Sequence, residues 1–73
     1  MTLKTIASNM TEIHTDGKTV LVSYSTPVAA CLHGLFYRTE QKWSATTSRH
    51  ITKWLQGYEA TTKPQAFFDA LLN

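Results

Sequence analysis

Asp16-Gly17 is the feature that most constrains the fold, because it stands between two segments of alternating polarity, Met10–Thr15 and Lys18–Ser25. An Asp-Gly pair readily adopts the two positive φ angles of a type I′ turn, which joins neighbouring antiparallel strands. If these two residues form the whole loop, Ile13 faces Val20 across the hairpin. The sequence therefore predicts an antiparallel hairpin with a fixed register.

This register sorts the side chains of the hairpin onto two faces. One face carries a mostly apolar set in which Thr11 faces Val22: Thr11, Ile13, Val20, Val22 and Tyr24. The other face carries a mostly polar set: Glu12, His14, Leu21 and Ser23. We expect a sheet with one buried face.

A second hairpin is predicted further along the chain. Ser25-Thr26-Pro27 interrupts the alternation, and proline lacks an amide hydrogen for a sheet, so we expect a bend, bulge or loop there. An extended segment begins at Val28, and His33-Gly34 provides the next turn. The facing pairs would be Leu32 with Leu35, Ala30 with Tyr37, and Cys31 with Phe36. Both faces of this hairpin are apolar, which indicates either burial on both sides or an exposed patch for a partner.

Helical signals follow Trp43. The first turn can be capped by any of three hydroxyl residues: Ser44, Thr46 and Thr47. Gly57 suits the position just after the helix. Apolar residues recur at helical spacing on one face, at Ile51, Trp54, Leu55 and Tyr58, and the opposite face carries Arg49, Lys53 and Gln56.

A last helix is predicted from Lys63 to Leu72. Thr62 and Gln65 have the spacing of a capping box, and Pro64 lies in the first turn, where a missing amide hydrogen costs little. An apolar stripe would dock this helix on the rest of the domain: Phe68, Leu71 and Leu72.

Together these elements predict an α+β fold. We expect a small antiparallel sheet of three to four strands, formed by the two hairpins, followed by two short helices packed on one face. A chain of 73 residues makes a single α+β domain over residues 1–73 with a modest core. Because Cys31 is the only cysteine, a disulfide within the chain is excluded, and a symmetric homodimer would be one source of added stability.

No cofactor or metal is expected. Cys31 and the three histidines lack the paired spacing of zinc ligands. No apolar run reaches membrane-spanning length, and the N-terminus lacks the apolar centre of a signal peptide. With a single thiol as well, we expect a cytoplasmic location and no membrane partner.

Basic and aromatic residues are interleaved between Tyr37 and Trp54. This segment holds four of the seven basic residues and both tryptophans, with Glu40 as its one acid. Cations can neutralise phosphates while aromatic rings stack on bases, so the pattern suits nucleic acid. It equally suits an ordinary strand followed by an amphipathic helix.

The candidate binding residues come from this segment: Arg38, Lys42, Arg49, Lys53, Tyr37 and His50. Tyr37 or Phe36 would be an aromatic anchor, because adjacent residues of a strand point to opposite faces. Thr46–His50 combines hydroxyls, a helix start and two potential cations, so it is either an anion site or simply a capped helix start.

Catalysis is not expected. Cys31 and His33 lie two residues apart on the same side of the predicted strand, but the sequence names no carboxylate that could orient the histidine. The five acidic residues are scattered and form no general acid–base pair. We therefore predict a protein that is not an enzyme.

Residues Thr26 to Leu55, TPVAACLHGLFYRTEQKWSATTSRHITKWL, resemble small uncharacterised proteins encoded by bacteriophages. The resemblance implies a phage or prophage origin and action in the cytoplasm of a host cell. It implies no mechanism, and no functional residue is carried over from it.

Three functions are consistent with the sequence. The first is a small non-enzymatic accessory protein that binds a host or phage protein and inhibits or modulates host machinery or defence. The second is a nucleic-acid-binding domain that uses the basic and aromatic surface, with affinity that falls steeply with salt. The third is a structural protein that self-associates as a homodimer through the apolar Ala29–Tyr37 hairpin.

Overall fold

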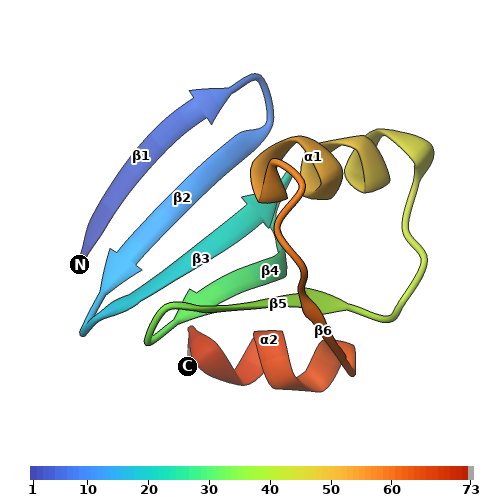
Figure 1. Ribbon diagram of the computed structural model, residues 1–73. Coiled ribbons are helices and arrows are strands. Elements are labelled where there is room, and N and C mark those ends of the chain that lie inside the picture. The colour runs from blue at the N-terminus through green and yellow to red at the C-terminus, as the bar shows by residue number, and fades with distance from the viewer. Residues whose placement is uncertain (73) are drawn as a thin grey trace.

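The computed structural model describes residues 1–72 as one sheet flanked by two helices (Figure 1). The elements follow one another as β1 (Thr2–Ala7), β2 (Met10–Thr15), β3 (Lys18–Ser23), β4 (Thr26–Leu32), β5 (Leu35–Thr39), α1 (Ala45–Leu55), β6 (Thr61–Lys63) and α2 (Gln65–Leu71). Neither helix is long enough to cross a membrane in the part of the chain described.

The sheet has six strands in the order of the chain, β1-β2-β3-β4-β5-β6. The first five pair antiparallel with their neighbours, and β6 runs parallel to β5, so that Arg38 pairs with Thr62. The predicted α+β class is thus correct, but the predicted sheet of three to four strands is wrong. Strands β1 and β6 were not predicted, and they form the two edges of the sheet. β6 follows α1 in the chain but pairs with β5, which precedes α1.

Turn chemistry fixes both predicted hairpins. Asp16 and Gly17 have φ angles of 46° and 75°, and His33 and Gly34 have φ angles of 52° and 81°. Both residues of each turn therefore adopt the left-handed conformation of a type I′ turn. All the predicted facing pairs are present: Ile13–Val20, Thr11–Val22, Leu32–Leu35, Ala30–Tyr37 and Cys31–Phe36.

The interruption at Ser25-Thr26-Pro27 contains both a turn and a register shift. β3 ends at Ser23, and Tyr24 enters the turn with φ 58°, where its amide donates to the carbonyl of Asn9 at 2.8 Å. The predicted placement of Tyr24 on the apolar face of the first hairpin is therefore wrong. The pairing between β3 and β4 then skips Val28, as in a β-bulge.

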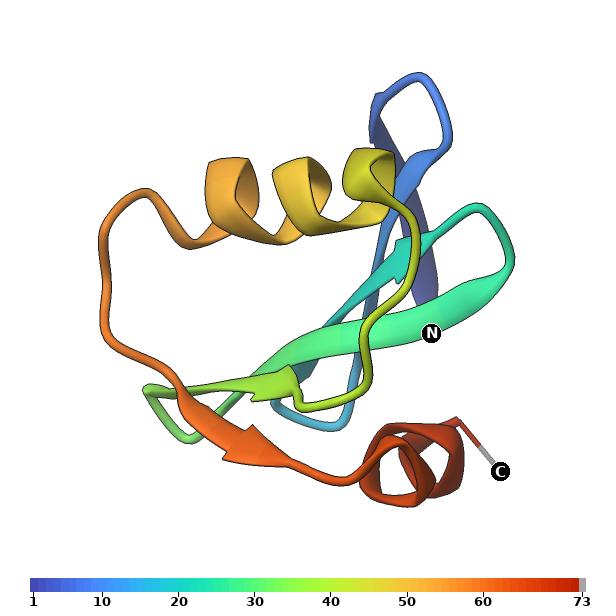
Figure 2. The same ribbon diagram turned by 90° about the vertical axis from the view of Figure 1, so that its right-hand side faces the viewer.

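The helices cover opposite faces of the sheet (Figures 1 and 2). α1 packs on the face that carries Leu21 and Ala29, whereas Phe68 of α2 packs on the face that carries Val20 and Ala30. The prediction that both helices lie on one face is wrong. Because β3 and β4 are central strands, they are buried on both sides, which explains their apolar residues at successive positions.

Burial of both faces also corrects the expected polarity of the first hairpin. Leu21 and Ser23 belong to the face predicted to be mostly polar, yet they are 0% and 2% exposed. Leu21 is covered by Ile51 and Leu55 of α1. The buried Ser23 hydroxyl is satisfied by hydrogen bonds to side chains of the same helix.

Ser44 caps α1. Its Oγ accepts a hydrogen bond from the Thr47 amide at 3.2 Å, so one of the three predicted caps is confirmed. The helix ends as Gln56 and Gly57 adopt φ angles of 52° and 87°. α2 begins later than predicted, because Lys63 belongs to β6 and Pro64 is its N-cap, with no side-chain cap bond. The predicted capping box of Thr62 and Gln65 is therefore absent.

Ser44→Ala is expected to lower the free energy of unfolding by about 0.5–2 kcal/mol, because it leaves a helix amide without its acceptor. Urea unfolding followed by circular dichroism would measure the change. Ser48→Ala is the matched control, since Ser48 is exposed within α1 and alanine favours a helix interior. Equal losses in both variants would contradict a capping role for Ser44.

Candidate functional site

Arg38 and Lys42 share a pocket at the start of α1. Arg38 is half-buried on β5, paired with Ala29, and therefore lies on the face of the sheet that α1 covers. Lys42 is exposed in the segment between β5 and α1. We call this the Arg38 pocket; it encloses about 400 Å³ and is lined by Arg38, Thr39, Glu40, Gln41, Lys42, Trp43, Ala45, Thr47, Ser48, Ile51 and Thr62.

Arg49 and Lys53 lie on the outward face of α1. Both are exposed, whereas Thr47, Ile51 and Leu55 of the same helix are buried. Neither basic residue lines the Arg38 pocket. The four predicted basic residues therefore do not form one site: Arg38 and Lys42 line a pocket at the start of α1, Arg49 lies on the exposed side of this helix, and Lys53 lies there too but also lines a second pocket.

These cations are not neutralised by the protein itself. Among residues 1–72, the one ion pair within 4.0 Å joins His14 Nε2 to Glu12 Oε1 at 3.0 Å. No lysine or arginine in that range has a carboxylate at this distance. The charge of Arg38 and Lys42 is therefore available to an external partner.

The structure does not bring Tyr37 to the Arg38 pocket. Tyr37 pairs with Ala30 and so points to the α2 face, where its ring centroid lies 5.5 Å from that of Phe67. The ammonium of Lys63 lies 6.0 Å from the Tyr37 ring centroid. Tyr37 thus packs α2 onto the sheet. Phe36, the alternative anchor, is on the α1 face.

His50 connects α1 to β3. Its Nδ1 lies 2.8 Å from Oγ of Ser23, which also lies 3.0 Å from Oγ1 of Thr47. A serine hydroxyl within hydrogen-bond distance of a histidine has the arrangement of a nucleophile and its general base. This hydroxyl is 2% exposed, however, and is shared with Thr47, so the contact holds the helix on the sheet. The centroid of the Tyr24 ring lies 6.0 Å from that of the imidazole, and the two planes are tilted by 37°.

A second pocket was not predicted. Its lining includes Glu12, whose Oε2 accepts from Trp54 Nε1 at 2.6 Å and whose Oε1 contacts His14. We call this the Glu12 pocket; it encloses about 510 Å³ and is lined by Ile6, Ala7, Met10, Glu12, His14, Thr19, Cys31, Phe36, Lys53, Trp54, Gln56 and Tyr58. Glu12 and Trp54 are 42 positions apart, so no local signal in the sequence links them.

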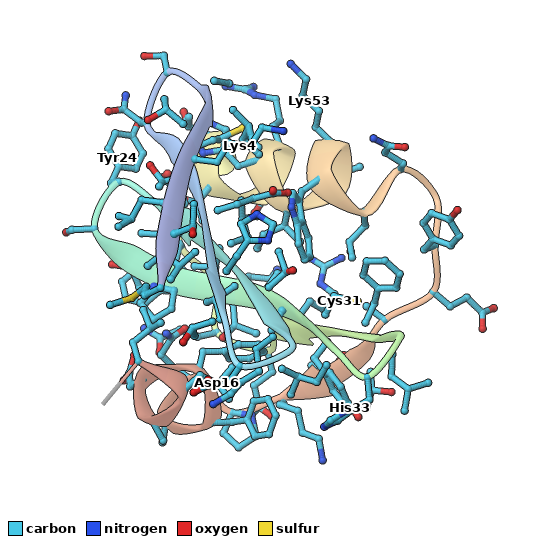
Figure 3. The ribbon with its side chains drawn as sticks, turned by 90° about the vertical axis from the view of Figure 1, so that its left-hand side faces the viewer. Lys4, Asp16, Tyr24, Cys31, His33 and Lys53 are labelled. Carbon is cyan, nitrogen blue, oxygen red and sulfur yellow. The ribbon has the colours of Figure 1, made fainter. Side chains whose placement is uncertain are left out.

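The cysteine and histidines do not gather into a metal site. Within residues 1–72, no three side chains of the His, Cys, Asp and Glu types lie close enough to hold a metal ion. Cys31 is half-buried on β4 and lines the Glu12 pocket, whereas His33 is exposed in the turn after β4. Figure 3 shows these two residues with Lys53 on α1.

The Ala29–Tyr37 hairpin lies inside the sheet. β4 and β5 are flanked by β3 and β6, and Ala29 and Ala30 are fully buried. Leu35, at the tip of the hairpin, is 61% exposed. The tip of this hairpin is therefore accessible for contact with a second copy of the protein, whereas its faces are not.

Neither curated proteins nor solved structures give a match to this chain. A model of a family of unknown function (DUF8033) matches residues 1–70, which include all six strands, α1 and all but the last residue of α2. The chain therefore belongs to this family of unknown function.

Proposed function

We propose that this protein is a small binding protein that occupies the surface of a protein partner through the Arg38 pocket. The observation that carries this proposal is Arg38, a half-buried residue whose guanidinium has no carboxylate within 4.0 Å among residues 1–72. A partly desolvated cation gains most from a partner that supplies the missing acceptor. The rigidly arranged N–H donors of the Arg38 guanidinium suit a carboxylate of the partner.

The other residues of the pocket suit a protein surface. Trp43 is 39% exposed, and its Nε1 donates to Gln65 Oε1 at 3.1 Å, which holds the ring in place before a partner arrives. Arginine and tryptophan are enriched among the residues that dominate protein interfaces. Glu40 lines the same pocket, and its negative charge suits a partner of mixed charge better than a polyanion.

The resemblance to bacteriophage proteins supports a more specific role. In this proposal the protein is a phage accessory protein that acts in the host cytoplasm and inhibits or modulates a host protein by covering part of its surface. Binding alone performs this function, without a chemical step.

The second candidate partner is a nucleic acid. It is favoured by the seven lysines and arginines, none of which has a carboxylate partner among residues 1–72. Each phosphate contact releases counterions, so binding would weaken steeply as salt rises. A protein partner predicts a shallower dependence and a defined stoichiometry.

The test compares capture of host proteins by the wild-type protein and by the double variant Arg38→Ala/Lys42→Ala. Loss of charged hydrogen bonds is expected to reduce capture of a specific protein about tenfold or more. Lys4→Ala/Lys18→Ala is the matched control, because it removes the same charge from residues that do not line the Arg38 pocket. Quantitative mass spectrometry of the captured proteins gives the measurement.

Equal capture of every protein by all three forms would contradict the proposed site. Fluorescence anisotropy of labelled duplex and single-stranded DNA and RNA, at low and physiological salt, tests the second candidate. Tight binding that weakens steeply with salt and is lost in Arg38→Ala/Lys42→Ala would replace the protein partner with a nucleic acid.

A further inference from the structure

The Glu12 pocket is separate from the Arg38 pocket and lies at the other end of α1. Its floor is the row of β-strand side chains that includes Thr19 and Cys31, and its walls are the end of α1 and the segment before β6. Figure 3 shows Cys31 on the sheet and Lys53 on α1. Its volume of about 510 Å³ lies within the usual range for small-molecule sites.

Aromatic rings form one wall of this pocket. Phe36 and Tyr58 stack with their planes 10° apart and their centroids 5.1 Å apart, and Trp54 meets Phe36 edge to face at 5.8 Å. Tyr58 nevertheless remains 63% exposed. A ring that is held by one neighbour and exposed elsewhere is a platform on which a planar ligand can stack.

The Glu12 carboxylate supplies a fixed acceptor. It is 19% exposed, and its two oxygens are held by Trp54 Nε1 at 2.6 Å and His14 Nε2 at 3.0 Å. A carboxylate accepts about four hydrogen bonds. It therefore keeps acceptor capacity in a fixed orientation, and a ligand that uses it must present N–H or O–H donors.

Lys53 adds a positive charge to the lining of the same pocket. Its ammonium has no carboxylate within 4.0 Å among residues 1–72. The pocket thus combines a stacking platform, an acceptor for donors on a ring edge, and a cation for an acidic group. A nucleotide carries all three complementary features in one molecule.

We infer that the Glu12 pocket binds a nucleotide, with the base stacked on Tyr58, its amino edge directed to Glu12, and its phosphate near Lys53. The nucleotide is either free or part of a single strand. This inference does not depend on the proposed protein partner, because the two sites have no lining residue in common.

The two tryptophans provide a site-specific test. Trp54 Nε1 donates to Glu12 in this pocket, and Trp43 Nε1 donates to Gln65 beside the Arg38 pocket. We would titrate the ¹⁵N-labelled protein with the four ribonucleoside monophosphates and record both indole N–H signals. At least one nucleotide should shift the Trp54 signal saturably and leave the Trp43 signal in place. It should also slow alkylation of Cys31, the only cysteine, by iodoacetamide.

Three variants assign the contacts. Tyr58→Ala should weaken nucleotide binding about tenfold or more, because it removes the stacking platform, and Tyr58→Phe should restore it. Glu12→Gln should alter the preference among the four bases, since an amide both donates and accepts. Both Tyr58 variants are expected to fold, because this side chain is largely exposed.

The controls separate the sources of the ligand. Binding of mononucleotides supports a free nucleotide, and binding of a ten-nucleotide RNA strand alone supports a nucleotide within a strand. Equal shifts with ribose 5-phosphate would overturn the inference, because the base would then contribute nothing. An unchanged Trp54 signal with every probe would also overturn it, whatever happens at Trp43.

Discussion

Phe68→Ala is expected to lower the free energy of unfolding by about 3–5 kcal/mol, the usual cost of removing a buried aromatic side chain. Phe68 is 0% exposed and packs among Val20, Val22 and Ala30 on the α2 face of the sheet. It is the one residue of α2 that is buried, and this helix has no side-chain cap bond. The docking of α2 therefore depends largely on this ring.

Such a loss is large for a small domain, because folded domains are stable by only about 5–15 kcal/mol. Urea unfolding monitored by circular dichroism would measure it. Phe67→Ala is the matched comparison, since Phe67 is adjacent but only half-buried. If both variants lost the same stability, the α2 face would not be organised around Phe68.

Gln65→Ala is expected to cost about 2–4 kcal/mol, because one amide satisfies four polar groups, and each buried group left unpaired costs about 1–3 kcal/mol. Gln65 Oε1 accepts from Thr39 Oγ1 at 2.9 Å and from Trp43 Nε1 at 3.1 Å. Its Nε2 donates to the Pro27 carbonyl at 2.6 Å and to Asp69 Oδ1 at 3.0 Å. The side chain thus joins β4, β5, the segment before α1, and α2.

The cost should come mainly from Thr39 and Pro27. Thr39 is 4% exposed, so water cannot easily replace the lost acceptor. Gln65→Glu should also destabilise the protein, because a carboxylate would face the Pro27 carbonyl and the Asp69 carboxylate without a donor. Gln41→Ala, at an exposed position, should stay within about 0.5 kcal/mol of the wild type. If Gln65→Ala and Gln41→Ala had the same midpoint of urea unfolding, the hydrogen bonds of the Gln65 amide would not contribute to stability.

Local chemistry explains which parts of the fold could be predicted. Asp16-Gly17 and His33-Gly34 each determine a turn, and a turn of fixed length determines the register of its strands. Ser44 and Gly57 mark the two ends of α1 in the same local way. The apolar residues on both faces of the second hairpin gave a further signal of burial on two sides.

The parts that could not be predicted depend on distant residues. β6 has only three residues, so its own sequence carries little strand signal. Its partner β5 is separated from it in the chain by α1. The placement of α2 opposite α1 depends on contacts of Phe68 with β3 and β4, far from α2 in the chain. For the candidate sites, Arg38 and Lys42 are close in the chain and share a pocket, whereas Glu12 meets Trp54 only in the folded protein.

The strand order of the sheet has a consequence for how the protein folds. From β1 to β5 each strand pairs with its neighbour in the chain, so most of the sheet can form through contacts of low sequence separation, which favours rapid folding. The docking of β6 against β5 is different, because it closes a loop that contains α1 and costs more chain entropy. The edge formed by β6, together with α2 behind it, is therefore the part of the sheet whose assembly should come last.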